Sequence, residues 1–512
     1  MDRGIGNWIP AQALRQPDKL ALVDSDSGRR QTYAELNART DRLADGLRQA
    51  GVQRGDRVAL LSLNSAEFLE TLFAVAKLGA VTVPINFRLA PAEVGYILAD
   101  SGASVLICSE VFTDLAGAAT ASAGVVVTTR FVIGTEFEAL VVSGSDATIE
   151  CDVEESDIAV IMYTSGTTGR PKGAMLTHAN MLWNAINTLT AAPEGLRRTD
   201  ITIAAAPLFH IGALGVHCLP LFYIGGTSIT TAAFVPDKLL KLMTDEKVSV
   251  QFLVPAMWAA LAQSPALDSF DPSNVRMAVS GGAPCPLTLI ELFLAKGWSF
   301  VEGFGMTETA PSCHLLDAAH IVSKSGSIGK PLRHIEFRIV DDDDTDVTVG
   351  TVGELTLRGP SLFAGYWGLP DATEAAWRGG WFHTGDLARE DEDGYVTLVD
   401  RKKDMIITGG ENVYPIEVEQ VLYRHPQVVE AAVIGVPNEK WGESVVAVVV
   451  TKSDPSTELA DELLEYTREH LARFKCPSSV EFVDVLPRNA TGKLLKRELR
   501  QTFSGTAESV SR

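Results

Sequence analysis

The alternation of short apolar runs with helical stretches is the feature that most constrains the fold of this chain. Thr32-Tyr-Ala-Glu35 has the spacing of a helix capping box, and a strand is predicted at Val58–Leu61. A second helix from about Ser65 to Leu78 leads into a strand at Ala80–Pro84. Helix and strand alternating at this distance predict α/β layers with largely parallel sheets. The same alternation recurs around Val105–Cys108, Ile158–Tyr163, Ile201–Ala206 and Val250–Val254.

The pattern changes in the last third of the chain, where short strands with turns replace the α/β alternation. These strands are predicted at Ile335–Val340, Gly353–Arg358 and Tyr395–Val399, and the acidic run Asp341–Asp344 between the first two is interpreted as a solvated turn. Asp400-Arg-Lys-Lys-Asp404 is a charged break, and beyond it lies a compact α+β pattern. Its elements are predicted at Val413–Arg424, Val428–Val436, Ser444–Thr451 and Glu458–Phe474. We therefore expect an N-terminal domain at 1–400 and a C-terminal domain at 401–512.

Composition excludes several function classes. The chain has 512 residues, and Lys+Arg 44 against Asp+Glu 65 gives a net charge of −21, which repels nucleic-acid backbones and anionic membranes on average. The six cysteines have no C-x-x-C spacing, which argues against a disulfide framework or a zinc site and fits a reducing compartment. No stretch has the apolar length of a signal peptide or of a membrane span. We expect a cytoplasmic protein.

A glycine- and hydroxyl-rich loop follows the predicted strand at Ile158–Tyr163. Its sequence from Thr164 is T-S-G-T-T-G-R-P-K-G, ending at Gly173. Glycines let several backbone N–H groups approach an anion, and hydroxyls and Lys172 add donors and positive charge, which suits a polyphosphate. The spacing is not that of a Walker A loop, which disfavours a P-loop phosphotransferase. Taken alone, such a loop is equally well explained as a flexible turn.

The loop resembles the signature loop of the adenylate-forming (ANL) superfamily, which includes acyl-CoA synthetases, luciferases and the adenylation domains of peptide synthetases. Further stretches in the same order support the resemblance over most of the chain. It implies layered α/β sheets plus a small β-barrel in the large N-terminal domain, and a small mobile α+β C-terminal domain. It also implies ATP, Mg²⁺ and CoA as ligands. The loop residues assigned to ATP by the resemblance are Thr164, Ser165, Gly166, Thr167, Thr168, Gly169 and Lys172.

Two more stretches extend the implied nucleotide site. Glu302-Gly-Phe-Gly-Met-Thr-Glu308 is similar to the family's Y-G-x-T-E segment, with a phenylalanine where tyrosine is usual. The resemblance implies that Phe304 stacks on adenine, that Thr307 binds near the α-phosphate, and that Glu308 holds Mg²⁺ with Thr164 as a further metal ligand. The other nucleotide-binding positions implied here are Gly303, Gly305, Met306, Gly282, Ala283 and Pro284. In Trp381-Phe-His-Thr-Gly-Asp386, Asp386 has the two oxygens needed for both ribose hydroxyls.

The resemblance places the remaining machinery after Asp400. Arg401 belongs to the family's hinge motif and is expected to reach the ribose or phosphate. Lys493, in Pro487-Arg-Asn-Ala-Thr-Gly-Lys493, resembles the lysine that bridges the substrate carboxylate and the α-phosphate. A rotation of the C-terminal domain is implied, after which Gly409 and Gly410 replace Lys493 and leave room for pantetheine. Trp441 matches a position that packs on CoA, Arg473, Phe474 and Lys475 lie where some relatives contact its nucleotide, and Lys496 is interpreted as a solvated surface charge.

The acyl site is expected around Pro207-Leu-Phe-His210, where His210 lines the carboxylate position. Ile211–Gly215 and Ser280–Pro284 supply small residues on its walls, which we expect to leave space for a long or bulky apolar acid. Peptide-synthetase domains carry an Asp in an F-D-x-S segment to pair with a substrate amine. The corresponding stretch here, Ala233-Phe-Val-Pro236, has no such Asp, which disfavours an amino-acid substrate.

The sequence thus predicts an ATP-dependent acyl-CoA synthetase for an apolar acid, with a medium- or long-chain fatty acid as the first choice. The alternatives are an aryl or alicyclic acid–CoA ligase, an acyl-AMP ligase that loads a carrier-protein thiol, and a catalytically silent relative that only binds nucleotide or acyl ligands. We expect no nucleic-acid partner and no transmembrane segment. Peripheral membrane contact and a homodimer both stay open.

Overall fold

The computed structural model describes residues 4–123, 127–147, 149, 151–164, 170–191, 195–438, 440–488 and 494–503. Its contacts divide the chain into two compact units. The first joins Met1–Phe337 to Leu357–Phe382, and the second joins Arg338–Thr356 to His383–Arg512. The chain therefore passes between the units more than once. The single domain boundary expected near Asp400 stays a prediction.

A seven-stranded sheet in the first unit carries the glycine-rich loop. Its order is β18-β8-β7-β4-β3-β5-β6. The strands are β3 (Arg57–Leu61), β4 (Val81–Pro84), β5 (Val105–Ser109), β6 (Thr129–Ile133), β7 (Ile158–Thr164), β8 (Lys172–Thr177) and β18 (Gly365–Tyr366). The strands from β7 to β6 pair in parallel, as predicted, whereas β8 pairs antiparallel with β7 and with β18. The loop at 165–169 thus connects two neighbouring antiparallel strands.

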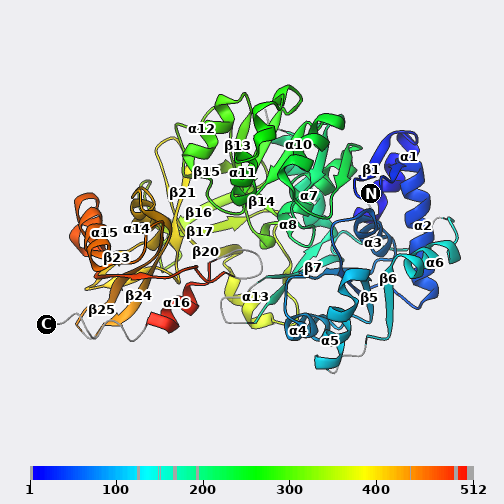
Figure 1. Ribbon diagram of the computed structural model, residues 1–512. Helices are drawn as coiled ribbons and strands as arrows, with labels where there is room; N and C mark the ends of the chain where they lie inside the picture. Colours follow the sequence, from blue (N-terminus) through cyan, green and yellow to red (C-terminus); the bar gives the residue numbers. More distant parts are fainter. Residues whose placement is uncertain are drawn as a thin grey trace. The chain divides into compact units, whose positions relative to one another are not determined.

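Helices cover both faces of this sheet (Figure 1). They are α2 (Tyr33–Gln49), α3 (Ala66–Lys77), α4 (Pro91–Ser101), α5 (Thr113–Ala123) and α6 (Thr135–Ser143). The predicted capping box is present, since the Thr32 hydroxyl accepts from the Glu35 N–H and the Glu35 carboxylate accepts from the Thr32 N–H. Apolar side chains of α4 and α5, among them Val94 and Ala116, pack on the strand residues Leu61 and Val83. The observed layers confirm the predicted α/β class.

A four-stranded sheet of the first unit has the order β2-β1-β10-β9. Its strands are β1 (Leu20–Asp24), β2 (Arg30–Thr32), β9 (Ile201–Ala204) and β10 (Thr227–Thr230), and the nearby helices are α1 (Trp8–Arg15), α7 (His178–Thr190), α8 (Ile211–Ala213) and α9 (Leu219–Ile224). A π-helical turn at Leu214–Cys218 joins α8 to α9. β9 therefore leads directly into the segment with His210.

The third sheet of the first unit contains β11 (Val250–Leu253), β12 (Met277–Gly281), β13 (Phe300–Gly305), β14 (Ser312–Leu316) and β15 (Ser327–Pro331). The first three strands are parallel, and β14 and β15 continue antiparallel. In sequence, α10 (Pro236–Asp245) precedes β11, α11 (Pro255–Ala262) follows β11, α12 (Leu287–Ala295) follows β12, and α13 (Pro370–Ala376) comes after β15. Because β12 and β13 are parallel and paired, Gly281 lies opposite Gly303, and the loops after both strands leave the same edge.

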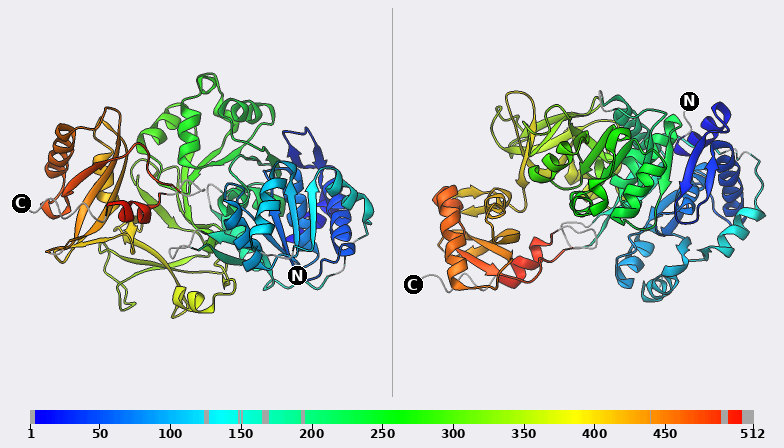
Figure 2. Two further views of the ribbon diagram at one scale, coloured as in Figure 1. Left: turned by 60° about the horizontal axis from the view of Figure 1, so that its bottom comes forward. Right: turned by 45° about the horizontal axis from the view of Figure 1, so that its top comes forward.

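The second unit contains most of β16 (Glu336–Val340), β17 (Gly353–Arg358), β20 (Trp381–Glu390) and β21 (Val396–Arg401) and all of a smaller sheet. That sheet consists of β22 (Ile406–Thr408), β23 (Glu411–Val413), β24 (Val428–Asn438), β25 (Gly442–Thr451) and β26 (Ser479–Phe482), with the helices α14 (Pro415–Leu422), α15 (Thr457–His470) and α16 (Lys496–Phe503). Along β24 the side chains alternate: Val433 packs toward α14 and α15, and Ile434 packs toward α16. Figure 2 shows α15 and α16 on opposite sides of these strands.

Among the described residues, no helix combines the length and the apolar character needed to cross a bilayer.

Candidate active site

The β7–β8 hairpin places Thr164 directly opposite Lys172. The Thr164 hydroxyl lies 3.5 Å from the Lys172 carbonyl oxygen, to which it donates. Gly173 is required next to this pair, because a Cβ there would lie 2.7 Å from Cγ2 of Ile161 and 3.1 Å from the Tyr163 ring. The predicted phosphate-binding residues Ser165, Gly166, Thr167, Thr168 and Gly169 lie outside the described residues. The structure therefore brings together the two ends of the predicted loop.

Tyr366 connects two of the predicted catalytic and binding residues, and no sequence pattern predicted its position there. Its hydroxyl donates to Oε1 of Glu308 at 2.9 Å, and Nζ of Lys172 lies 4.9 Å from the centre of its ring. β18 holds Tyr366 by pairing it with Ala174, two residues after Lys172. A tyrosine whose partner is 58 positions away leaves no periodic signal in the sequence. Lys172 and Glu308, predicted from separate motifs, thus meet on one side chain.

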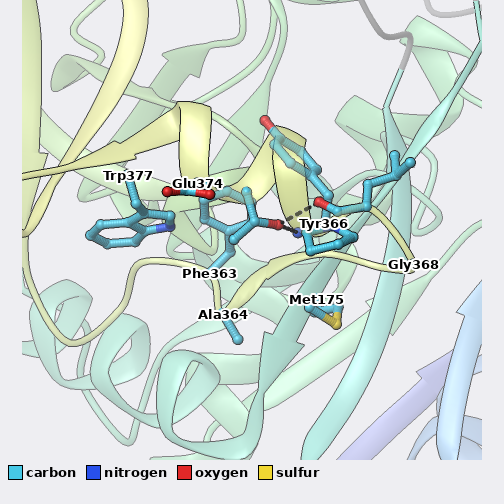
Figure 3. Close-up of a pocket in the computed structure, with 10 residues that line it drawn as sticks. Met175, Phe363, Ala364, Tyr366, Gly368, Glu374 and Trp377 are labelled. Atoms are coloured by element: carbon cyan, nitrogen blue, oxygen red, sulfur yellow. Dashed lines mark hydrogen bonds between the residues drawn. The ribbon is translucent and has the colours of Figure 1, made fainter.

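An open pocket of about 680 Å³ lies beside Tyr366 (Figure 3). Phe363, Tyr366 and Trp377 form aromatic walls, and Glu374 is the carboxylate among the lining residues. Thr373 fixes this wall, because its hydroxyl accepts from the Tyr366 N–H at 2.8 Å and donates to the Leu369 carbonyl at 3.0 Å. Of the described residues, none that was predicted for the nucleotide site lines the pocket. The pocket lies beside Tyr366, which contacts both Lys172 and Glu308.

The ends of β12 and β13 bring together the other predicted nucleotide residues of the first unit. Gly282, Ala283 and Pro284 follow β12, and the segment Gly303–Glu308 ends β13. A Cβ at Gly305 would lie 1.7 Å from the Pro311 carbonyl oxygen, so only glycine fits there. Phe304, Met306 and Thr307 are all partly accessible. The predicted nucleotide residues after β12 and β13 therefore lie at the carboxyl ends of parallel strands, where α/β sheets bind ligands.

Glu302, on β13, contacts the loop that follows β12. It is 9% exposed, and its Oε1 accepts a hydrogen bond from the Cys285 N–H at 3.0 Å. Burial raises the pKa of the Glu302 carboxyl to about 7, and the bond from Cys285 opposes that rise. One end of the Gly282–Cys285 loop is thus held by a carboxyl group that titrates near neutral pH.

His210 stands at the end of an aromatic cluster. Its ring centre is 4.4 Å from that of Phe209, which meets Phe87 edge-on at 5.1 Å, and Phe87 stacks on Phe112 at 5.0 Å. Burial, with a smaller effect of the nearby Arg88 guanidinium, lowers the pKa of His210 to about 4. The imidazole is therefore neutral at pH 7 and can donate or accept a hydrogen bond beside an apolar wall.

Several glycines of the expected acyl walls face neighbouring segments of the chain. A Cβ on Gly215 would lie 2.4 Å from Cδ of Pro311, and one on Gly281 would lie 2.8 Å from the Gly303 carbonyl oxygen. A Cβ on Gly212 would touch the Phe252 ring at 3.4 Å. These glycines permit close packing of neighbouring segments. The expectation of space for a long or bulky acid stays a prediction.

In the second unit, Asp386 and Arg401 are paired across β20 and β21. Oδ1 of Asp386 lies 2.8 Å from Nε of Arg401. Asp386 is 3% exposed, so its carboxylate is oriented by a buried charge-assisted contact. Two residues that were assigned separately to the ribose region are therefore neighbours.

Gly409 and Gly410 form the turn between β22 and β23, with φ of +59° and +86°. A Cβ on Gly409 would lie 3.0 Å from the Trp441 ring, which is itself 50% exposed. Three residues assigned to the CoA step thus lie together. Lys493 falls outside the described residues. The interpretation of Lys496 as a solvated charge was wrong, because its side chain is 12% exposed and its Nζ lies 2.8 Å from Oε1 of Glu419.

The donor set suits a magnesium ion that is shared with a nucleotide. Within the described ranges, no three His, Cys, Asp or Glu side chains gather into a metal cage. Mg²⁺ characteristically takes one or two protein ligands and completes its shell with phosphate oxygens and water. Glu308 next to Lys172 fits that requirement, because an anionic and a cationic side chain lie at the same tyrosine. All six cysteines lie in the described part of the chain, and each is a free thiol there.

Comparison with known proteins agrees with this geometry. The family model of the AMP-binding enzymes matches residues 9–367, and that of the AMP-binding enzyme C-terminal domain matches 417–493. This chain belongs to the AMP-binding enzyme family. It is thus a member of the adenylate-forming superfamily, with a large N-terminal and a small C-terminal domain, and it is an AMP-forming acid–thiol ligase that uses ATP, Mg²⁺ and CoA.

Three relatives illustrate the range of acids in the family. A feruloyl-CoA synthase of Amycolatopsis sp is 46% identical over 502 residues, covering 98% of this chain and 99% of that one. The long-chain-fatty-acid–CoA ligase FadD13 of Mycobacterium tuberculosis is 38% identical over 507 residues, covering 98% and 99%. The structure of Bacillus subtilis o-succinylbenzoate CoA synthetase (MenE) with ATP and magnesium ion has a TM-score of 0.87 at 33% identity, covering 96% and 99%. The names of these three relatives refer to three different acids.

Proposed function

We propose that this ligase activates a compact aromatic carboxylic acid of the arylpropenoic type and transfers the acyl group to CoA. The observation that carries this proposal is the 46% identity with a feruloyl-CoA synthase over nearly the whole of both chains. The aromatic cluster that ends at His210 and the packed glycines around Phe252 support an acid that is apolar but short. An amine-bearing acid is disfavoured because Ala233–Pro236 offers no carboxylate.

The first half-reaction joins the acid carboxylate to the α-phosphate of ATP and expels pyrophosphate. Lys172 neutralises charge on the triphosphate, and Glu308 with Thr164 holds Mg²⁺. Phe304 stacks on adenine, Asp386 accepts from the ribose hydroxyls, and Lys493 bridges the carboxylate and the α-phosphate. These roles place charge stabilisation, and no acid–base pair, at the centre of the chemistry.

His210 and Thr307 act at the reacting end. The neutral imidazole of His210 contributes a hydrogen bond beside the acid carboxylate without adding a charge. Thr307 lies one residue before Glu308 and reaches the α-phosphate. In the second half-reaction the C-terminal domain, 401–512, rotates so that Gly409 and Gly410 stand where Lys493 stood. Trp441 then packs on CoA, and thioester formation releases AMP.

A second candidate substrate is a medium- or long-chain fatty acid, favoured by the 38% identity with FadD13. A pyrophosphate-release screen separates the two. It uses cinnamic, 4-hydroxycinnamic and 4-hydroxy-3-methoxycinnamic acids beside straight-chain acids of graded length, each with ATP, Mg²⁺ and CoA. We expect a higher kcat/KM for the aromatic acids. A preference for long straight chains would overturn the aromatic assignment, and thioester formation only on a carrier-protein thiol would overturn CoA as the acceptor.

A further inference from the structure

Helix α4 contacts the chain on both sides of the predicted phosphate-binding loop. Before the loop, Tyr163 directly precedes Thr164, and its hydroxyl donates to Oδ2 of Asp100 at 2.6 Å. After the loop, the Pro171 carbonyl oxygen accepts from the Tyr96 hydroxyl at 3.2 Å. Tyr96 and Asp100 are four residues apart on α4, so they lie on the same face of the helix. One helix face thus holds both ends of the loop.

The two α4 side chains are also joined to each other. Oδ1 of Asp100 lies 3.3 Å from the Tyr96 hydroxyl, so Tyr96 shares its one proton between Asp100 and the Pro171 carbonyl. The ring of Tyr96 adds a second contact with the end of the loop, because the Arg170 guanidinium lies 5.8 Å from the ring centre. The Asp100 carboxylate therefore accepts from a tyrosine of β7 and from a tyrosine of its own helix, and it connects the two loop ends.

The same end of α4 contacts the segment on the other side of Lys172. β8, which begins at Lys172, lies between β7 and β18 in the sheet, and Trp367 directly follows β18. The Trp367 indole N–H donates to the Asp100 carbonyl oxygen at 3.0 Å. The Trp367 backbone N–H donates to the carbonyl oxygen of Gly173, the residue after Lys172, at 2.8 Å. Asp100 therefore contacts both chain segments that flank the strand of Lys172.

The position of Asp100 is unfavourable for the helix itself. Asp100 lies in the last turn of α4, and that turn has no basic side chain. A carboxylate near the C-terminus of a helix meets the negative end of the helix dipole. The chain thus has an acid where helix stability disfavours one, and the hydrogen bonds from Tyr163 and Tyr96 are what the carboxylate gains there. These contacts indicate a role at the loop and not within the helix.

We propose that Asp100 and Tyr96 are positioning residues of the ATP phosphate site, and that they act by fixing the two chain segments that carry Thr164 and Lys172. The proposal rests on the proposed function, because it takes Thr164 and Lys172 as groups that bind Mg²⁺ and phosphate. Loss of the Asp100 carboxylate releases Tyr163 and Tyr96 together, so ordering the phosphate-binding groups around ATP costs more entropy. Affinity for ATP then falls, whereas affinity for the acid, whose proposed site is formed by other segments, is retained.

The test measures the Kd for ATP with Mg²⁺ by isothermal titration calorimetry, without any acid, in the wild type, Asp100→Ala, Asp100→Asn and Tyr163→Phe. Asp100→Ala removes a charged hydrogen-bond acceptor, so the Kd should rise about 10-fold or more. Asp100→Asn keeps an acceptor oxygen without the charge and should raise the Kd less. Tyr163→Phe should also raise the Kd, and these two conservative variants keep the test valid if the alanine variant folds poorly.

Two further measurements separate positioning from a general loss of structure. Tyr163→Phe combined with Asp100→Ala should raise the Kd for ATP no further than Asp100→Ala alone, since both substitutions remove the same hydrogen bond. The KM for ATP, measured with the acid that the pyrophosphate-release screen selects, should rise by a factor similar to that of the Kd. The KM for that acid should stay at the wild-type value.

Asp45→Ala is the matched control. Asp45 also lies near the C-terminal end of a helix, α2, where it is 6% exposed and accepts from the Ser145 N–H at 2.8 Å. The same substitution there should lower the melting temperature and leave the Kd for ATP unchanged.

A wild-type Kd for ATP in both Asp100 variants and in Tyr163→Phe would overturn this inference alone. A rise in the KM for the acid as large as the rise for ATP would also overturn it, because the effect would then not be confined to the phosphate site. Lys172→Ala with a wild-type Kd for ATP would instead overturn the proposed role of Lys172 and, with it, the inference.

Discussion

At the residue scale, Tyr366 is the side chain that most changes how the site is understood. Its hydroxyl donates to Glu308 and its ring lies under the Lys172 ammonium, so one residue contacts both the proposed metal ligand and the proposed phosphate-binding cation. A hydrogen bond to a charged group contributes about 1.5–3 kcal/mol. We predict that Tyr366→Phe lowers kcat/KM for adenylation about 10-fold or more and raises the Mg²⁺ concentration needed for half-maximal rate. Pyrophosphate release during a Mg²⁺ titration measures both effects.

Tyr33→Phe provides the control for this change. Tyr33 is fully buried and its hydroxyl donates to the Gly226 carbonyl at 2.7 Å, so the substitution also removes one tyrosine hydrogen bond, but away from Glu308. It should leave the Mg²⁺ dependence at the wild-type value. Glu308→Gln should shift the Mg²⁺ dependence further than Tyr366→Phe does. If Glu308→Gln left the response to Mg²⁺ unchanged, Glu308 would not be a metal ligand.

At the scale of elements, the β12 and β13 ends depend on the buried carboxyl of Glu302. Its pKa of about 7 in the folded chain exceeds the ordinary value of 4.5, so the folded state retains a proton that the unfolded state has lost. Stability contributed by this group is therefore lost as pH rises from 4.5 through 7. We predict that Glu302→Gln, which stays neutral, gains melting temperature relative to the wild type as pH rises. The gain corresponds to about 3 kcal/mol at most above pH 7.

Thermal melts of the wild type and Glu302→Gln at pH 5 and pH 8 measure this difference. Glu354→Gln is a suitable comparison, because Glu354 is also buried but accepts from Lys402 at 3.1 Å, and an ion pair should be weakened by neutralisation at either pH. A Glu302→Gln difference that is the same at pH 5 and pH 8 would show that this carboxyl does not titrate between them.

Many of the helices and strands could be predicted because local sequence patterns determine them. The capping box at Thr32 and the strand at Val58–Leu61 follow from neighbouring residues alone. The expected strand Ile201–Ala206 instead ends at Ala204, and the amide of the distant Asn64 donates to the carbonyls of Ala204 and Ala206 at 2.8 Å each. Tertiary contacts of this kind, like those of Tyr366 and Phe252, join residues far apart in sequence and leave no local pattern.

The same distinction between local pattern and tertiary contact applies to the residues predicted from motifs. Chemistry-bearing residue types in a fixed local order predicted roles for Lys172, Glu308 and Asp386, and these roles stay predictions. The character of the acyl wall depended on which side chain from another strand fills the space beside each glycine. Lys496 was misjudged for this reason as well, since Glu419, on α14, buries it in an ion pair. The residue types in a motif therefore predict which chemistry a site can perform. The free space beside the motif depends on side chains that only the fold brings close.

At the scale of the whole molecule, the proposed residues are divided between two compact units. Lys172 and Glu308 belong to the first, whereas Asp386, Gly410 and Lys493 belong to the second. A two-step reaction that uses Lys493 only for adenylation and Gly410 only for thioester formation should therefore be separable by substitution. Lys493→Ala should lower the rate of adenylation from free acid and ATP by at least ~100-fold, because it removes a positive charge that stabilises the transition state. It should spare CoA-thioester formation from supplied acyl-adenylate.

Gly410→Leu should show the reverse pattern. An added Cβ at Gly410 would have nothing within 4 Å, but the φ of +86° strains the backbone of any L residue there. The leucine side chain would also occupy the proposed thiol path. It should keep ATP–pyrophosphate exchange and lose thioester formation. Lys452→Ala, which removes a lysine of the second unit that donates to the Pro426 carbonyl, should affect neither step. Equal losses of both half-reactions in Lys493→Ala and in Gly410→Leu would mean that the two groups serve one static site, and a rotation of the C-terminal domain would then have no role in catalysis.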